Sequence, residues 1–467
     1  MQPWLWLEMG AEGQVPSKCL LLEVWVLWSM CKFLFYMNHC NLTDHRKTTK
    51  DFCGNKQVKR PSCSKSNGLA RVIGYYEGWS TTQRPCSQFY PEQIPIGVYT
   101  TINFAFATID PKTFEVRPAD SSDPQMYKRV ALLKQKDPDL KVFIAIGGWT
   151  FSDPGPTRTT FSDLAASVPR QKAFFKSLTT FMATYDFDGV DIDWEYPEAD
   201  DRAGRPIDYA NFPKFIHNLR GALSGTGGRD GISVTLPASY WYLQHFDLQA
   251  LSKDVSWFNV MSYDLHGTWD RGNKWVGNFL NAHTNLTEID LAMDLIWRNN
   301  IKPDQVVLGM AFYGRAFTAT SSSCTEPGCT FESGAEKGPC SKEISILLNS
   351  EIDDIVAKNK IKPKLYKDAA VKVATWKNQW VAYDDEDTFK MKTEYAQEKC
   401  LGGVMVWTIS HDTQDAKYSK ALAKVTNRKF IALSDHDGSG DPTQKVDTKH
   451  DQCKWTNCGE SMYNPNK

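Results

Sequence analysis

Short apolar segments that alternate with amphipathic stretches recur along the chain from residue 71 onward. Stretches such as 170–185 and 209–223 have the pattern of helices. The apolar segments that read as buried strands are 71–77, 100–108, 141–147, 188–194, 232–238, 257–263, 306–312 and 403–409. Near-continuous apolar strands that alternate with helices are typical of a parallel sheet buried on both faces, and eight of them are enough to close a barrel. We therefore predict an α/β fold, a (β/α)8 TIM barrel.

The interval between the seventh and eighth strands is much longer than the others, at some ninety residues. It contains three cysteines in its first half, β-like runs at 371–376 and 379–383, and a helical stretch at 342–357. Barrel loops are the usual place for an inserted subdomain. We predict a small α+β insertion over residues 316–392 that raises one wall above the mouth of a barrel spanning residues 70–428.

Charge gives no sign of a nucleic-acid or membrane-surface partner, because 54 basic and 55 acidic residues leave a net charge of -1 over 467 residues. We expect a monomer with no stable membrane partner.

The chain is rich in aromatic residues, with sixteen Trp and eighteen Tyr. Most of them would fill the core, and the excess would suit stacking against sugar rings.

The twelve cysteines cluster in a few stretches, without the paired Cys-x-x-Cys spacing of a zinc site. Clustered cysteines in Gly/Ser/Pro-rich sequence are typical of disulfides in an exported protein, so we expect a secreted, extracellular location.

The two ends of the chain differ from the barrel region. Within residues 1–50, the stretch 19–37 is apolar, but Glu23 and Lys32 interrupt it, and it makes a poor signal peptide and a poor membrane anchor. A truncated or wrongly assembled start and a genuine targeting segment both stay open. Residues 429–467 have the composition of a polar linker followed by a Cys-containing tail.

The fourth apolar segment and the residue that follows it, 188–195, hold four carboxylates in eight positions, Asp-Gly-Val-Asp-Ile-Asp-Trp-Glu. On a strand, Asp191, Asp193 and Glu195 share one face, because side chains two apart project the same way. Like charges in one column are tolerated where a metal, a cationic ligand or a shared proton relieves them. A calcium loop would need another spacing, and a solvated edge would not interleave Val, Ile and Trp. We interpret the column as a buried functional site.

With these residues the chain resembles the family 18 glycoside hydrolases, and within them the chitinases. The acidic run matches the family signature Asp-x-x-Asp-x-Asp-x-Glu in full, on the fourth strand as in the family. The resemblance covers about residues 70–425, and the inserted stretch resembles the chitinase insertion domain. Further matches are Gly74 to Trp79, Asn103 to Phe106, Gly147 to Trp149, Met261, Tyr263, Asp264, Tyr313 to Arg315, and Trp407.

The resemblance implies hydrolysis with retention, in which the 2-acetamido carbonyl of the substrate attacks the anomeric carbon to give an oxazolinium intermediate. Glu195 would be the acid and then the base, Asp193 would turn between Asp191 and the acetamido N–H, and Tyr263 would donate to the acetamido oxygen. Asp188 is out of phase with the column and is expected to be structural. No metal or other cofactor is expected. The expected sugar-binding residues are Trp407, Trp149, Tyr76, Phe104, Met261, Asp264 and Arg315.

One position departs from the family pattern. Many relatives carry Ser-x-Gly-Gly on the third strand, where this chain has Ala145, Ile146, Gly147 and Gly148. The missing hydroxyl removes a hydrogen bond to the inner aspartate, so the proton-sharing network is expected to differ.

Residues 51–66 resemble the end of a hevein-like chitin-binding module of the sort fused to killer-toxin-like fungal chitinases. The substrate expected from all of this is chitin or a chitooligosaccharide. Two alternatives remain: a chitin-binding lectin that does not hydrolyse, and an endo-N-acetylglucosaminidase acting on N-glycans. Lectin-like relatives usually lose the acid, which is present here as Glu195.

Overall fold

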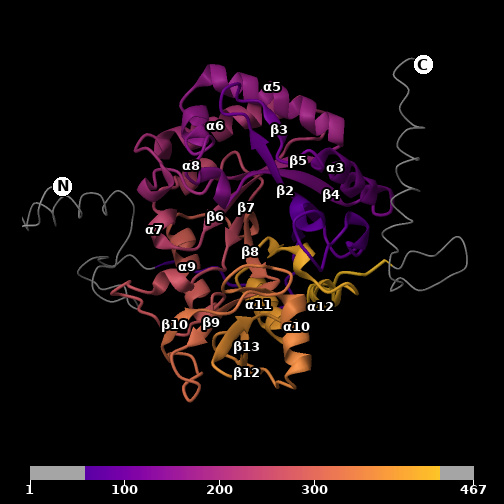
Figure 1. Ribbon diagram of the computed structural model, residues 1–467. Helices are drawn as coiled ribbons and strands as arrows, with labels where there is room; N and C mark the ends of the chain where they lie inside the picture. Colours follow the sequence, from indigo (N-terminus) through magenta and orange to yellow (C-terminus); the bar gives the residue numbers. More distant parts are fainter. Residues whose placement is uncertain (1–57, 432–467) are drawn as a thin grey trace, which may run out of the picture.

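A closed barrel forms the centre of the computed structural model, which describes residues 58–431 (Figure 1). The first strand, β1, pairs with both β2 and β15, so the parallel sheet closes on itself. The predicted TIM barrel is confirmed. Its parallel strands are β1 (Arg71–Glu77), β2 (Thr101–Ile109), β4 (Lys141–Gly147), β5 (Gly189–Asp193), β6 (Gly231–Pro237), β7 (Trp257–Met261), β8 (Val306–Ala311) and β15 (Gly403–Trp407). A short strand, β3 (Val116–Pro118), adds antiparallel to β2.

Helices cover the outside of the barrel because each presents an apolar stripe to the strands. In α6, Phe212, Phe215, Ile216, Leu219 and Leu223 recur at helical spacing and are buried. The main helices around the barrel are α3 (Asp123–Leu132), α4 (Thr160–Ala165), α5 (Val168–Tyr185), α6 (Asp208–Leu223), α9 (Leu286–Arg298), α11 (Glu386–Glu398) and α12 (Lys417–Val425). Two single-turn helices, α7 (Tyr240–Leu243) and α8 (Leu248–Leu251), follow β6.

Alternation along each strand separates two cores. Outward-facing residues such as Val190 and Ile192 pack under the helices in the main hydrophobic cluster. Inward-facing residues such as Ile73, Tyr75 and Ala145 form a second, smaller cluster inside the barrel. Any polar side chain at an inward position therefore lies in a largely dry interior.

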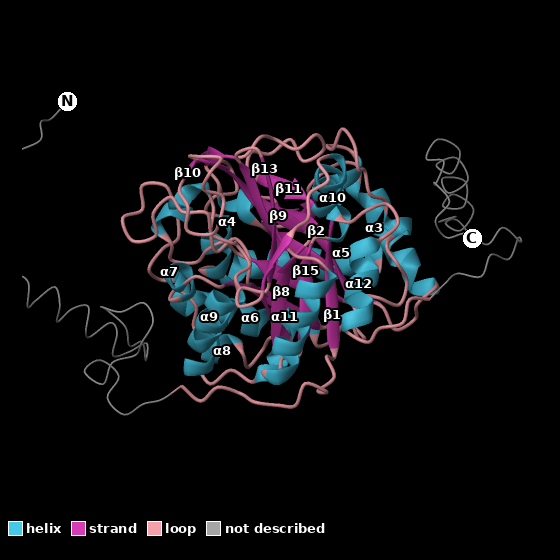
Figure 2. Cartoon of the chain, turned by 90° about the horizontal axis from the view of Figure 1, so that it is seen from below, coloured by secondary structure: helices cyan, strands magenta, loops and turns pink. Residues whose placement is uncertain are grey.

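The insertion stands at the carboxyl ends of β8 and β15, as Figure 2 shows. It joins the barrel directly, since β9 (Tyr313–Ala319) begins two residues after β8 ends. The predicted insertion between the seventh and eighth barrel strands is confirmed as an antiparallel sheet with one helix, α10 (Asn349–Lys358). The other strands of the insertion are β10 (Phe331–Gly334), β11 (Ile346–Leu348), β12 (Lys364–Tyr366), β13 (Val371–Trp376) and β14 (Gln379–Tyr383).

The helix predicted over 342–357 begins too early. Residues Ile346–Leu348 instead form β11, because their backbone pairs with Tyr313, Gly314 and Arg315 of β9. The helix begins at Asn349, where Glu351 accepts the backbone N–H of Leu348 at 2.9 Å and caps the first turn.

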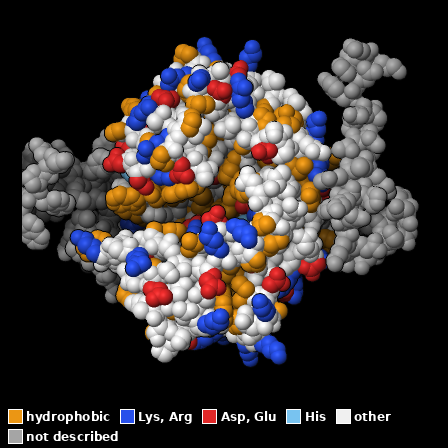
Figure 3. Space-filling model, in the orientation of Figure 1, with side chains coloured by type: hydrophobic (Ala, Val, Ile, Leu, Met, Phe, Trp, Pro, Cys, Tyr) orange, Lys and Arg blue, Asp and Glu red, His pale blue; other side chains and the backbone are white. Residues whose placement is uncertain are grey.

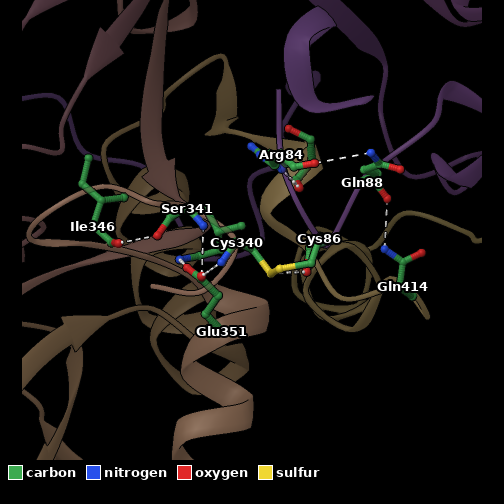
Figure 4. Close-up of a disulfide and its surroundings, with 11 residues drawn as sticks. Arg84, Cys86, Gln88, Cys340, Ser341, Ile346, Glu351 and Gln414 are labelled. Carbon is green, nitrogen blue, oxygen red and sulfur yellow. Dashed lines mark hydrogen bonds between the residues drawn. A yellow bond between two sulfur atoms is a disulfide. The ribbon is translucent and has the colours of Figure 1, made fainter. Parts of the chain in front are cut away.

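Disulfides join segments that are distant in the sequence. Cys63 is bonded to Cys400 and Cys86 to Cys340, whereas Cys324 and Cys329 close a short loop. Figure 4 shows that Cys86–Cys340 ties the segment after β1 to the insertion, close to Glu351, which accepts the backbone N–H groups of Cys340 and Ser341. The cysteine clustering therefore does mark disulfides.

The predictions for the ends of the chain fall largely outside the described residues: 1–50, most of 51–66, and the tail beyond 431. Within the part of 51–66 that is described, Cys63 is bonded to the barrel through Cys400. Among residues 58–431, no helix combines the length and hydropathy that a membrane span requires.

Candidate active site

The carboxylate column lies inside the barrel. On β5, Asp191 pairs in register with Ala145 and Asp193 with Gly147, while Val190 and Ile192 face the helices. The exposed fraction rises along the column, from 0% at Asp191 to 4% at Asp193 and 8% at Glu195. The three carboxyl groups therefore run from the barrel interior to its mouth.

Asp191 is held by three donors from three strands. The Tyr75 hydroxyl on β1 donates to Oδ2 at 2.7 Å, and the Ser233 hydroxyl on β6 donates to Oδ1 at 2.6 Å. The Asn259 amide on β7 donates to Oδ1 at 3.0 Å and is itself oriented by the indole N–H of Trp257. Burial raises the pKa of Asp191, and these hydrogen bonds oppose the rise. Ala145 has no hydroxyl to donate, but the three hydrogen bonds from Tyr75, Ser233 and Asn259 still stabilise the Asp191 carboxylate.

Asp193 and Glu195 have raised pKa values. Burial raises the pKa of Asp193 well above its usual range, and the charges of Glu195 and Asp191 add to the shift. The Thr235 hydroxyl donates to Asp193 Oδ1 at 2.5 Å. Burial raises the pKa of Glu195 to about 7, although a hydrogen bond with Tyr196 and the charge of Arg202 lower it. A carboxyl group at the barrel mouth thus stays protonated close to neutral pH.

Aromatic side chains surround the top of the column. The Trp407 ring lies 5.4 Å from the ring of Tyr75, 5.8 Å from that of Phe106 and 6.4 Å from that of Trp79. The Tyr263 hydroxyl donates to Met405 Sδ at 4.0 Å, a weak contact. Its pKa is raised well above the usual range, first by burial and then by the charge of Asp193, so it remains a donor. Met261 is half-buried and packs against both hydrophobic clusters.

Asp264 and Arg315 form a charged pair beside Tyr263. Arg315 Nε donates to Oδ1 at 2.8 Å and Nη2 to Oδ2 at 2.6 Å, and the Tyr313 hydroxyl donates to Oδ1 at 2.7 Å. Burial opposes ionisation of Asp264, but Arg315 and His283 hold its pKa below the usual range. The Arg315 guanidinium also lies over the Trp269 ring, 4.8 Å from its centroid. A fixed negative charge therefore stands at the mouth.

Trp149 and Asp188 are not members of the column itself. The Trp149 side chain follows β4 and is 49% exposed. Asp188 precedes β5, where its Oδ2 accepts the backbone N–H of Val142 at 2.8 Å and faces Lys134 at 3.3 Å, which fastens the start of the strand.

The structure contradicts the sugar-binding role expected for Tyr76 and Phe104. Both are fully buried in the layer between barrel and helices, with their rings 5.5 Å apart. The Tyr76 hydroxyl donates to the carbonyl of Phe89. Strand alternation turns these residues outward and turns Tyr75 inward, so the expectation was wrong by one residue on β1.

Several residues of the site were missed by sequence reasoning, namely Tyr75, Trp79, Phe106, Ser233, Thr235 and Asn259. The signal for Ser233, Thr235 and Asn259 was available: polar side chains at alternating positions of otherwise apolar strands. Their inward direction depends on register, which fixes Ser233 opposite Asp191.

Figure 3 shows a groove that crosses the middle of this face of the molecule. Hydrophobic side chains line it, and acidic ones lie in its floor. Beside it, a hollow of about 700 Å³ is lined by Thr268, Arg271, Phe331, Glu336 and Lys337, between the loop after β7 and the insertion. A long, extended ligand would fit such a surface better than a small compact one.

Comparison with known proteins identifies a family and several relatives of similar sequence and fold. The family model described as "Glycosyl hydrolases family 18" matches residues 71–412. The chain is 29% identical over 440 residues to "Secreted chitinase LysM12" of Penicillium expansum, covering 86% of this chain but only 28% of that protein. It is 28% identical to mouse "Chitotriosidase-1", covering 73% of each. Among solved structures, catalytic domain 2 of the Ostrinia furnacalis Group II chitinase superposes with a TM-score of 0.68 at 25% identity, covering 76% of this chain and 96% of that one.

Proposed function

Because the chain belongs to glycosyl hydrolases family 18, we propose that it is a chitinase that cleaves β-1,4 bonds between N-acetylglucosamine units with retention. The observation that carries the proposal is the inward carboxylate column, with Glu195 at its top and a pKa of about 7. Such a group can give its proton to a leaving oxygen near neutral pH and later take one from water.

The nucleophile in this mechanism comes from the substrate. The acetamido carbonyl oxygen attacks the anomeric carbon, the glycosidic C–O bond breaks, and the leaving oxygen takes the Glu195 proton. Water activated by the Glu195 carboxylate then opens the oxazolinium ring, which restores the acetamido group and the protonated acid. Two inversions give net retention.

Asp193 would orient the acetamido group. It can accept the acetamido N–H and so align the carbonyl for attack, and once its proton passes to Asp191 its negative charge would stabilise the oxazolinium cation. Asp191, with three donors of its own, is held in place as the inner partner to which Asp193 can turn. The high pKa of Asp193 lets the two share one proton.

The remaining residues would shape the sugar pocket. The Tyr263 hydroxyl would exchange its weak contact with Met405 for the acetamido oxygen. Trp407 would form the apolar floor under the sugar, with Met261 lining the pocket beside it. Asp264, held by Arg315, would accept a sugar hydroxyl, and Trp149 would stack on a neighbouring ring.

The disulfides, two of which close loops of more than 250 residues, support a secreted protein that acts outside the cell. We propose that it acts there as a monomer. The groove seen in Figure 3 favours a polymer over the N-glycan expected for an endo-N-acetylglucosaminidase.

Release of reducing ends from colloidal chitin tests the proposal. The purified chain should release them, and Glu195→Gln should bind chitin while losing activity by roughly 10²–10⁴-fold. A chitin-binding lectin would bind with no release from either protein. Release from an N-glycan but not from chitin would favour the endo-N-acetylglucosaminidase.

A further inference from the structure

Arg202 is a buried cation that joins two segments beside the acid, the one that follows β4 and the one that follows β5. It ends the short helix η5 (Asp200–Arg202) in the loop after β5 and is 6% exposed. Its Nε donates to the backbone carbonyl of Glu195 at 3.1 Å, and its Nη1 to Asp153 Oδ1 at 2.8 Å. Its Nη2 donates to the backbone carbonyl of Trp149. One rigid side chain therefore joins the ends of β4 and β5.

The same guanidinium covers one face of the Trp149 ring. Arg202 Cζ lies 3.7 Å from the ring centroid, and the Tyr196 ring meets the indole edge-on at 6.4 Å. Trp149 nevertheless remains 49% exposed, as a ring with one covered and one open face would be. A cation stacked on the face of an aromatic ring attracts the ring electrostatically, which favours one orientation of the ring.

The loop is built to hold Arg202 in this place. A Cβ at Gly204 would lie 2.4 Å from the backbone nitrogens of Ala199 and Glu198, so only glycine allows the chain to fold back there. Asp208 Oδ2 accepts the backbone N–H groups of Glu198 and Arg205. The guanidinium is thus positioned before any ligand arrives.

Arg202 is also the cation that acts on Glu195. Among the groups that act on this carboxyl, Arg202 and the Tyr196 hydrogen bond lower its pKa, while Asp264 and Asp153 raise it. From the same column, Asp193 is coupled to it electrostatically, and the Tyr263 hydroxyl lies within the same field. Removing the Arg202 charge therefore removes an influence that favours the ionised acid.

We propose that Arg202 is a positioning residue that locks the open face of Trp149 and the main chain of Glu195 into one unit, so that a stacked sugar and the acid keep a fixed separation. The inference rests on the proposed function. It concerns how two elements of the site are held together, not which bond is cleaved.

Three variants test it: Arg202→Lys, Arg202→Gln and, as a control, Arg129→Gln. Arg129 is a similarly shielded arginine that stacks over Tyr90, 5.0 Å away, and pairs with Glu92 outside the site. Lysine keeps the charge but cannot contact three acceptors and a ring at once. Melting temperatures of all variants are recorded first. Binding of chitotetraose is then measured by tryptophan fluorescence in a Glu195→Gln background, and kcat/KM is measured from pH 4 to 9.

Both Arg202 variants should bind chitotetraose about ten-fold more weakly or worse, because the Trp149 ring loses its support. Arg202→Gln should also move the alkaline limb of kcat/KM upward by about one pH unit, since the acid loses a neighbouring cation. Arg202→Lys should leave that limb near its original place, and Arg129→Gln should change neither.

Folded Arg202→Lys and Arg202→Gln variants with wild-type binding and an unmoved alkaline limb would overturn the inference. If Arg202→Gln does not fold, the binding of Arg202→Lys decides it alone. Wild-type protein that binds chitotetraose without cleaving it would overturn the proposed function, while the binding measurement still tests Arg202.

Discussion

Burial raises the pKa of all three carboxyl groups of the column, Asp191, Asp193 and Glu195. Each carboxyl group is almost inaccessible to water, so its ionisation costs free energy. The number of hydrogen bonds that offset this cost differs along the column. Asp191 has three donors, whereas one side-chain hydroxyl, that of Thr235, donates to Asp193. The charge is therefore best accommodated at the inner end, on Asp191, while Asp193 and Glu195 both favour the protonated form.

The pH profile of activity follows from Glu195. Its pKa of about 7 predicts that kcat/KM falls about ten-fold per pH unit above pH 7, because the leaving group then finds no proton. Initial rates on a soluble chitooligosaccharide between pH 4 and 9 measure this. A profile that stays flat to pH 9 would contradict the assignment of Glu195 as the acid.

The same pKa affects stability. The folded-state pKa of Glu195 lies above the ordinary 4.5, so its contribution is full below about pH 4.5 and is lost as the pH rises through 7. Glu195→Gln removes this dependence and should be more stable than wild type above pH 7, by at most about 3 kcal/mol. Urea unfolding at pH 5 and pH 8 checks it. A variant less stable than wild type at pH 8 would show that the burial cost is overstated.

A hydroxyl at position 145 should be able to replace the hydrogen bond that Ser233 donates to Asp191. Ser233→Ala removes a buried hydrogen bond and should lower the free energy of unfolding by about 1–3 kcal/mol and reduce kcat. Ala145 is the register partner of Asp191 on the other side, so Ala145→Ser in the Ser233→Ala background should restore part of both losses. Urea unfolding and kcat of the single and double variants test this. Additive losses would mean that a hydroxyl at 145 does not reach the carboxylate.

Side-chain ties between elements hold the insertion against the barrel. Asp384, just after β14, and Lys392 of α11 form a fully buried ion pair, with Nζ 2.5 Å from Oδ1 and 2.7 Å from Oδ2. The Asn349 side chain at the start of α10 donates to the carbonyl of Asp384. These contacts fix the end of the inserted sheet to a barrel helix.

Breaking this pair should be costly. Lys392→Met leaves a buried carboxylate without a partner and should lower the free energy of unfolding by about 3–5 kcal/mol. Asp384→Leu combined with Lys392→Met replaces both charges with apolar groups and should recover most of the loss. Urea denaturation of the three proteins measures it. A double variant no more stable than Lys392→Met would show that the pair is needed as such.

Strands and helices were predictable because their patterns are long and periodic. The segment 71–77 coincides with β1, and Asp191 and Asp193 lie on the predicted fourth strand, which ends at Asp193, two residues before Glu195. What failed was the face of a fully buried strand. In β1, Tyr75 and Tyr76 are both apolar enough for either side, so the pattern did not say which faced the barrel axis. Asn259 could not be linked to Asp191 from sequence, because their contact depends on closure of the barrel.

The molecule is fastened at two distant points by disulfides. Cys63–Cys400 joins the segment before β1 to the end of α11, and Cys86–Cys340 joins the segment after β1 to the insertion. They link residues separated by 337 and 254 positions. Cross-links that close such long loops restrict the unfolded chain most.

Loss of a disulfide should therefore destabilise the fold more when the bond closes a long loop than when it closes a short one. Cys86→Ser with Cys340→Ser should lower the free energy of unfolding by about 2–5 kcal/mol, and Cys324→Ser with Cys329→Ser by clearly less, because the latter pair is only 5 residues apart. Thermal unfolding of both variants, with and without a reductant, measures this. An equal loss from the two changes would rule out the loop-length explanation.

The stereochemistry of the first product tests the substrate-assisted mechanism most directly. We would follow the cleavage of chitotetraose by proton NMR from the first seconds, before the anomers equilibrate, with wild type and Glu195→Gln side by side. Wild type should release the β-anomer first, and Glu195→Gln should release almost none. Initial release of the α-anomer, or undiminished release by Glu195→Gln, would contradict the mechanism.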